Sequence, residues 1–223
     1  MIKRILFDLD NTLIPWDGSQ KVALLNTFKE CDIDFPPDRM DEYFSAMKDY
    51  EKKHKRFDKV EMSKWIGMKL NLDIPDDFIK SWTDKLCYCV PDKDNELISL
   101  LEYLSSKYSL CVVSNWFYNQ QKARLKKYGI LKYFDDIYTA DKYDKKPYKE
   151  MYDLAGKDYQ RDEIAMVGDD YTIDIKSAVD YGMYAFYLNS KARYCNKKTK
   201  IIRTIYDLRK YLWEELELVL LLC

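Results

Sequence analysis

The stretch RILFDLDNTL, from Arg4 to Leu13, starts like a buried strand and ends in two closely spaced carboxylates, Asp8 and Asp10. Two like charges at the end of an apolar segment repel each other, and taking them out of water is costly. The pair therefore predicts a polar site at the end of a strand, with a compensating positive charge nearby.

Strand-like runs and segments of helical period alternate along most of the chain. The strand-like runs are residues 3–8, 109–115, 136–140, 164–168 and 183–188. Helical segments precede each of the last four runs, at residues 95–107, 117–128, 148–155 and 172–181. Glycine follows the last three of these, at Gly129, Gly156 and Gly182, which predicts left-handed helix ends. The alternation predicts an α/β fold, a Rossmann-like doubly wound parallel sheet.

Residues 15–90 interrupt this alternation. Apolar residues recur there at helical spacing, as at Val22, Leu25 and Phe28, and Pro36-Pro37 breaks the pattern. We expect a small helical domain over residues 15–90, inserted into a core formed by residues 1–14 and 91–223.

The composition argues against several classes of function. Basic and acidic residues nearly balance, 37 against 38, so global charge does not favour a nucleic-acid partner. The six glycines form neither a dinucleotide-binding nor a P-loop motif. The single histidine, His54, lies in a charged run and is expected to face solvent rather than to serve a catalytic triad.

Apolar runs are too short to span a bilayer, the N-terminus has no signal-type segment, and the cysteines form no C-x-x-C pair. A reduced, cytoplasmic protein with no membrane partner is expected. The apolar end LELVLLLC continues a helical pattern through Leu212, Leu216 and Val219, and predicts a packed terminal helix. Either a monomer or a homodimer is compatible with it.

Polar residues follow four of the expected strands. They are Asp8 and Asp10, then Ser114 and Asn115, then Lys145 and Lys146, and finally Asp169, Asp170 and Asp174. In open parallel sheets ligands bind at the carboxyl edge of the strands, so these groups are expected to converge. So many acids share a site only when a cation neutralises them, and hard oxygen ligands suit Mg²⁺.

A Mg²⁺ ion beside a lysine is suited to holding a phosphoryl group. Because no P-loop is present to hold a nucleotide, a carboxylate nucleophile that forms an aspartyl-phosphate is the natural chemistry. A second acid two residues further on can protonate the leaving oxygen and then activate water.

These motifs resemble those of the haloacid-dehalogenase-like (HAD) hydrolase superfamily. FDLDNTL matches its D-x-D-x-T signature, VVSN its second motif, KKP the lysine-proline of its third, and VGDDYTID its G-D-x-x-x-x-D motif. Their order and approximate spacing hold along most of the chain.

The resemblance implies a role for each acid. Asp8 would be the nucleophile and a Mg²⁺ ligand. Asp10 would be the general acid and base, and its main-chain carbonyl would also contact the metal. Asp169 would bind Mg²⁺ directly, whereas Asp174 would orient the lysine or a metal-bound water. Asp170 stands where a small residue is common, which leaves the ligand set open.

The resemblance also implies the phosphate-binding groups. Ser114 would bond a phosphoryl oxygen, helped by Asn115 and the N-terminus of the next helix. Lys146, directly before a proline and therefore favoured over Lys145, would stabilise charge on the nucleophile and the phosphoryl group. Thr12 would support the loop at the phosphate site.

Family members with a helical insertion after the first motif use it as a cap that closes over the site, and residues 15–90 fit that subgroup. Trp16 would either border the leaving-group pocket or pack at the hinge of the cap. The basic span 189–203 is expected to be a solvated loop, with attraction of an anionic substrate as the alternative.

The leading prediction is a Mg²⁺-dependent phosphatase of a small phosphorylated metabolite. A dehalogenase is disfavoured because Asp10 is present. A phosphosugar mutase stays open, although Gly168 stands where mutases carry an acid. A receiver-type signalling module, which holds one phosphoryl group without turnover, is the alternative from another class. A sugar phosphate, phosphoglycolate and a nucleoside monophosphate are all compatible substrates.

Overall fold

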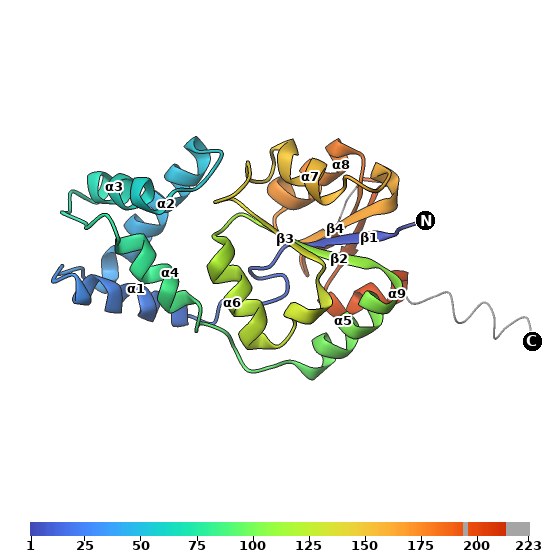
Figure 1. The fold of residues 1–223 in the computed structure, drawn as a ribbon, viewed down its shortest axis with the longest axis horizontal. Coiled ribbons are helices and arrows are strands. Elements are labelled where there is room, and N and C mark those ends of the chain that lie inside the picture. The colour runs from blue at the N-terminus through green and yellow to red at the C-terminus, as the bar shows by residue number, and fades with distance from the viewer. Residues whose placement is uncertain (194–195, 213–223) are drawn as a thin grey trace, which may run out of the picture.

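A parallel sheet organises the computed structural model, which describes residues 1–193 and 196–212. Over these residues the sheet has six strands in the order β3-β2-β1-β4-β5-β6 (Figure 1). The strands are β1 (Arg4–Phe7), β2 (Ser109–Ser114), β3 (Asp136–Thr139), β4 (Ile164–Gly168), β5 (Tyr184–Leu188) and β6 (Thr199–Ile202). This confirms the predicted α/β fold with a doubly wound parallel sheet.

The central strand β1 pairs with β2 on one side and with β4 on the other. In register, Phe7 lies opposite Val112 of β2 and Val167 of β4. Every residue of β1 and β4 is buried, as expected for strands covered on both faces. Chain order reverses at β1, so the carboxyl ends of β1, β2 and β4 form the crevice where ligands bind in such sheets.

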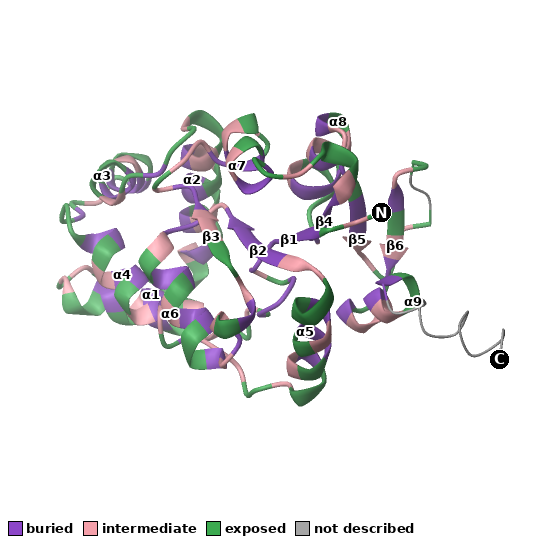
Figure 2. Cartoon of the chain, turned by 45° about the vertical axis from the view of Figure 1, so that its right-hand side comes forward, coloured by how far each residue is buried: buried purple, intermediate pink, exposed green. Residues whose placement is uncertain are grey.

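Helices cover both faces of the sheet, and the buried strands lie between them (Figure 2). Ile5 and Phe7 pack into one core with Leu100 and Leu208, whereas Leu6 packs into the other with Met151. The helices of this part are α5 (Asn95–Lys107), α6 (Tyr118–Tyr128), α7 (Lys149–Ala155), α8 (Ser177–Tyr181) and α9 (Arg209–Leu212).

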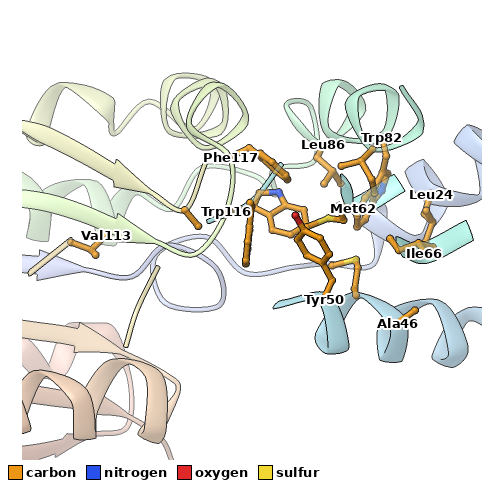
Figure 3. Packing of buried hydrophobic residues seen from close by; sticks show 14 of the residues in the cluster. Leu24, Ala46, Tyr50, Met62, Ile66, Trp82, Leu86, Val113, Trp116 and Phe117 are labelled. Atoms are coloured by element: carbon orange, nitrogen blue, oxygen red, sulfur yellow. The ribbon is translucent and has the colours of Figure 1, made fainter. Parts of the chain in front are cut away.

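The helices between β1 and α5 lie together to one side of the sheet (Figure 1). They are α1 (Ser19–Glu30), α2 (Met40–Lys53), α3 (Lys59–Leu70) and α4 (Phe78–Leu86). Aromatic rings fill their interior, where Phe28 and Phe35 stack with centroids 4.1 Å apart. Toward the sheet, Trp82 of α4 meets Trp116, which follows β2, at 5.9 Å between centroids (Figure 3).

Two local expectations were wrong. The basic span 189–203 was expected to be a loop, but β6 pairs with β5 at residues 199–202, where Thr199 and Ile202 are buried and Lys200 is exposed. A charged residue on an edge strand is ordinary, and four residues are too few to show the alternation in the sequence. Gly156 was expected to be left-handed, but its φ is −106°. A Cβ at that position would lie 2.6 Å from Cδ1 of Ile164, so space rather than conformation favours glycine there.

The expected left-handed helix ends are confirmed at Gly129 and Gly182, with φ of 88° and 107°. The predicted terminal helix begins as α9, and its continuation through Leu216 and Val219 lies outside the described residues, as do Cys195 and Cys223. Among the described helices, none combines the length and apolar character that crossing a membrane requires.

Candidate active site

The turn after β1 directs Asp8 and Asp10 to the same side of the sheet edge. The turn is closed by paired main-chain bonds, in which Ile14 donates to the Leu9 carbonyl and Asn11 donates to the Ile14 carbonyl, both at 3.0 Å. Asn11 adopts the left-handed region at φ 60°, which asparagine tolerates better than most residues. Leu9 is fully buried in the core, and the acids on either side of it both line a cavity at the ends of the strands.

Lys146 joins the first and fourth motifs. Its Nζ donates to Oδ1 of Asp8 at 2.8 Å and to Oδ1 of Asp174 at 2.6 Å, and the lysine is only 1 % exposed. Thr12 Oγ1 donates to the other oxygen of Asp8 at 3.1 Å. Asp8 is thus held on both carboxylate oxygens by charge-assisted or hydroxyl bonds. The expected preference for Lys146 over Lys145 agrees with this placement.

The acids of the cluster outnumber their one ammonium partner. Burial raises the pKa of Asp8, and Lys146 only partly opposes that effect. Burial likewise raises the pKa of Asp174 to about 7, again against the attraction of Lys146. Burial disfavours the charge of Lys146, but Asp174 and Asp8 outweigh it and raise the lysine pKa above its usual value.

Asp169 brings a further carboxylate to this cluster. Its pKa is raised to about 6, first by burial and then by the negative charge of Asp8. Carboxylate oxygens of Asp8, Asp169 and Asp174 lie within 4.8 Å of one another. A Cβ on Gly168 would lie 2.4 Å from Oδ2 of Asp174, so only glycine permits this approach. Hard oxygen donors with uncompensated negative charge fit a divalent cation such as Mg²⁺.

Asp174 is committed to hydrogen bonds within the site. Lys146 occupies its Oδ1, and the main-chain N–H of Asp170 donates to its Oδ2 at 3.1 Å. The side chain of Asp170 caps the next turn, because its Oδ1 accepts from the N–H groups of Thr172 and Ile173, both at 2.8 Å. That turn, Tyr171–Lys176, is π-helical, so the single helix expected over residues 172–181 is divided into this turn and α8. Such turns are frequent at functional sites.

Ser114 and Asn115, at the end of β2, have different neighbours. Ser114 is buried, and its Oγ accepts a bond from Gln121 Nε2 at 2.8 Å, which leaves the hydroxyl proton free to donate. The amide of Asn115 bonds to the main chain of Lys146. It donates to the Lys146 carbonyl and accepts from the Lys146 N–H, both at 2.8 Å. The Asn115 side chain therefore holds Lys146 in place, and its expected contact with phosphate stays a prediction.

Sequence reasoning missed two site residues of α6. Gln121 Nε2 donates to Oδ2 of Asp10 at 2.6 Å, and Arg124 forms an ion pair with Oδ1 of Asp10. Both lie on the inward face of the helix, together with Leu125 and Tyr128. Two polar residues three positions apart on the face that carries buried apolar residues are a signal that could have found them.

The cavity above the acids has a volume of about 390 Å³. We call six of its polar residues at the strand ends the floor: Asp8, Asp10, Ser114, Lys146, Asp169 and Asp174. We call the residues that α1, α2 and α4 contribute the helical wall: Gln20, Phe44, Met47, Glu51, Trp82 and Leu86. Trp116 stands between the two, against Trp82 and Phe117 (Figure 3).

Trp16, expected either to border a pocket or to pack, does both of these locally. It lines the cavity, and the guanidinium of Arg124 lies over its ring, with Cζ 3.8 Å from the ring centroid. Glu51 of the helical wall is a titratable group that the motifs do not include. Burial raises its pKa to about 7, against the attraction of Lys145 and Lys48.

Comparison with known proteins gives a family and a set of relatives. Residues 5–187 match the haloacid dehalogenase-like hydrolase family. The chain is 27 % identical over 201 residues to a ribulose-1,5-bisphosphate 5-phosphatase of Halopiger xanaduensis, covering 82 % of this chain and 83 % of that protein. It is 25 % identical over 208 residues to the pyrimidine 5′-nucleotidase YjjG of Escherichia coli, covering 85 % and 87 %.

Solved structures show the same fold. The HAD-hydrolase YfnB of Bacillus subtilis, solved with bound magnesium, superposes with a TM-score of 0.80 at 19 % identity, covering 95 % of this chain and 98 % of that one. A 2-haloacid dehalogenase of Pseudomonas syringae gives a TM-score of 0.70 at 20 % identity, covering 96 % and 99 %. With the family match extending over most of the sheet and the helices beside it, the chain belongs to the haloacid dehalogenase-like hydrolases.

Proposed function

We propose that this chain is a Mg²⁺-dependent phosphatase that hydrolyses a small phosphate monoester through an aspartyl-phosphate on Asp8. The observation that carries the proposal is the convergence of the floor. An acid held by a buried lysine, a second acid two residues away and a carboxylate cluster all line one cavity. Phosphatases and nucleotidases among the relatives support the same class of reaction.

In the first step, a carboxylate oxygen of Asp8 attacks phosphorus while the bond from phosphorus to the leaving oxygen breaks. Asp10, two residues on and lining the same cavity, gives its proton to that oxygen, so a free alcohol departs. Lys146 stabilises charge on the transferred group, and the Ser114 hydroxyl donates to one of its oxygens. Asp8, the main chain of Asp10 and Asp169 would hold Mg²⁺, which supplies further neutralisation of the phosphoryl oxygens.

In the second step, Asp10 accepts a proton from a water molecule as the water oxygen attacks the aspartyl-phosphate. The bond between phosphorus and Asp8 breaks, inorganic phosphate leaves, and both acids return to their starting forms. Asp174 orients Lys146 throughout, since both of its oxygens are already bonded within the site.

We propose that residues 15–90 form a cap domain over a core of residues 1–14 and 91–223. The helical wall closes one side of the cavity, which excludes water from the floor while phosphorus is attacked. The same wall would contact the leaving group, so it would choose the substrate.

Among the compatible substrates we favour a nucleoside monophosphate. Phe44, Trp82 and Trp116 place aromatic surface around the leaving-group side of the cavity, and planar bases stack well on such rings. Glu51 adds an acceptor for an N–H group of the base. The pyrimidine 5′-nucleotidase relative supports this substrate class, and the ribulose bisphosphate phosphatase relative marks sugar phosphates as the comparison to test.

The test is multiple turnover of p-nitrophenyl phosphate with Mg²⁺, measured as the amount of phosphate released per chain. Wild-type protein should release many equivalents per chain, and Asp8→Asn should lower kcat by at least about 10³-fold because no other group replaces the nucleophile. Asp84→Asn is the matched control, because it removes an exposed acid of α4 that does not line the cavity, and it should keep full activity.

Three results would contradict the proposal in different ways. Release of one equivalent or less would indicate a receiver-like module. Conversion of a sugar phosphate into its isomer, without free phosphate, would indicate a mutase. Full activity of Asp8→Asn would place the nucleophile elsewhere.

A further inference from the structure

Asp10 owes its position to α6 rather than to its own loop. Its Oδ2 accepts from Gln121 at 2.6 Å, and its Oδ1 is paired with Arg124. Gln121 Oε1 in turn accepts from Arg124 Nη1 at 3.1 Å, so the glutamine and the arginine brace each other. Each carboxylate oxygen of Asp10 keeps a further lone pair for the cavity, where its side chain is 25 % exposed.

Arg124 is anchored by both connections between the sheet and α1–α4. Its Nε donates to the Cys89 carbonyl at 3.2 Å, in the segment that follows α4. Its guanidinium lies over the ring of Trp16, in the segment that precedes α1, with Cζ 3.8 Å from the centroid. The side chain is completely buried.

This burial is hard to explain by stability alone. Nη2 of Arg124 is buried and has no hydrogen-bond partner among the described residues. A buried polar group without a partner is destabilising, and the desolvation of a buried paired charge offsets most of what the pairing returns. Arg124 is buried in this way one hydrogen bond from the second acid of the first motif, so its placement points to a task in the reaction.

We propose that Arg124 is a positioning residue for Asp10, which together with Gln121 aims its carboxyl group at the leaving oxygen. This inference rests on the function proposed above. Fixing the carboxyl group before the reaction starts lowers the entropy that must be lost in the transition state.

The dependence of the rate on the leaving group separates positioning from a structural role. An alkyl phosphate needs its leaving oxygen protonated, whereas p-nitrophenolate departs without a proton. Loss of Arg124 should therefore lower kcat for an alkyl phosphate monoester by about 10²-fold or more, and for p-nitrophenyl phosphate by less than about tenfold. A structural defect would lower both rates equally.

The experiment measures kcat on both substrates for wild type, Arg124→Ala, Arg124→Lys and Gln121→Met. The fall in kcat for the alkyl phosphate should exceed the fall for p-nitrophenyl phosphate, most strongly in Arg124→Ala and less in Arg124→Lys and Gln121→Met. Added guanidinium should restore part of the alkyl phosphate rate in Arg124→Ala alone. Arg4→Ala is the matched control, because Arg4 is also buried and paired, with Asp136, at the opposite end of β1. It should change the ratio of the two rates by less than about twofold.

The outcomes distinguish failure of the role of Arg124 from failure of the phosphatase proposal. Arg124→Lys and Gln121→Met conserve size and are expected to fold even if Arg124→Ala does not. If both variants lower kcat equally on the two substrates, the role of Arg124 is overturned and the phosphatase proposal stands. Absence of turnover by the wild type on either substrate overturns both. Unequal loss with rescue by guanidinium supports both.

Discussion

The floor of the cavity is polar and held by a network of hydrogen bonds, whereas the helical wall opposite it is largely aromatic and apolar. On the floor, Lys146 is fixed through its main chain by Asn115 and through its side chain by Asp8. On the wall, Phe44 and Met47 have no comparable partners and contribute surface to the cavity. Transfer of a phosphoryl group needs each atom placed closely, but contact with a leaving group needs only a surface of suitable shape.

Because of this difference, floor and wall residues should tolerate substitution unequally. A floor residue can seldom be replaced, because its hydrogen bonds need one particular functional group. A wall residue can be exchanged for another of similar size, so substrate choice is free to change while the chemistry stays the same. Four variants or treatments test this division, from the strongest expected effect to the weakest.

Removing the divalent cation should abolish activity, because Asp8, Asp169 and Asp174 would then face Lys146 alone. Chelation is expected to reduce phosphate release to the background of Asp8→Asn. Mg²⁺ at a hundred times its dissociation constant should stabilise the fold by about 2.7 kcal/mol, which corresponds to a rise in Tm of about 5–10 °C. Thermal unfolding with and without Mg²⁺ measures the second effect without reference to activity.

Asp169→Asn should lose most of this thermal shift, since it removes a carboxylate of the cluster. A substitution of an acid outside the floor, Asp84→Asn, should keep it. An unchanged thermal shift in Asp169→Asn would place the cation away from the floor and contradict the division between a catalytic floor and a substrate-contacting wall.

Replacing a wall residue should alter substrate affinity and leave the chemistry intact. Phe44→Ala is expected to raise KM for nucleoside monophosphates by about tenfold, since stacking of a base on an aromatic ring is worth about 1–3 kcal/mol. Its kcat on p-nitrophenyl phosphate should change by less than about twofold. Steady-state kinetics on nucleoside and sugar monophosphates measures both effects.

The control for this variant is Val22→Ala, which truncates an exposed side chain of α1 outside the cavity. A fall in kcat for Phe44→Ala on every substrate would show that the helical wall takes part in the chemistry.

The weakest effect is expected from Glu51, the acid of the wall. Its folded-state pKa of about 7 lies above the usual 4.5, so the folded protein binds a proton here that the unfolded chain releases between these values. The contribution of Glu51 to stability is therefore present below pH 4.5 and is lost as pH rises toward 7. Glu51→Gln, which cannot ionise, should become progressively more stable relative to wild type over that range, and should then stay level.

Urea unfolding at pH 5, 6, 7 and 8 measures this difference. A constant difference between Glu51→Gln and wild type at all four values would mean that Glu51 is solvated in the folded protein, and that the wall is more open than the structure shows.

Much of the floor could be predicted from the sequence. Asp8, Ser114, Lys146 and Asp169 lie at or after the carboxyl ends of predicted strands, and parallel strands end at one edge, so local pattern was enough to bring them together. Other features could not be predicted, because they depend on which side chain reaches which. One of them is the pairing of the Asn115 amide with the Lys146 main chain, thirty-one residues away.

The helical wall and α6 were the least accessible to prediction. Helical spacing in residues 15–90 predicts helices with an apolar side, but it could not show which of their residues, such as Phe44, line a cavity rather than a core. Gln121 and Arg124 resemble ordinary polar residues of a surface helix until the fold turns that face toward Asp10.

The amino-acid sequence by itself determined the parallel sheet, the edge at which the acids gather and the family to which the chain belongs, because short-range periodicity and motif spacing carry that information. Only the tertiary structure decided that Lys146 is shared by Asp8 and Asp174, and that Arg124 connects Asp10 to both segments leading to α1–α4. Contacts between side chains far apart in the chain depend on the packing of whole elements, and no local pattern in the sequence encodes them.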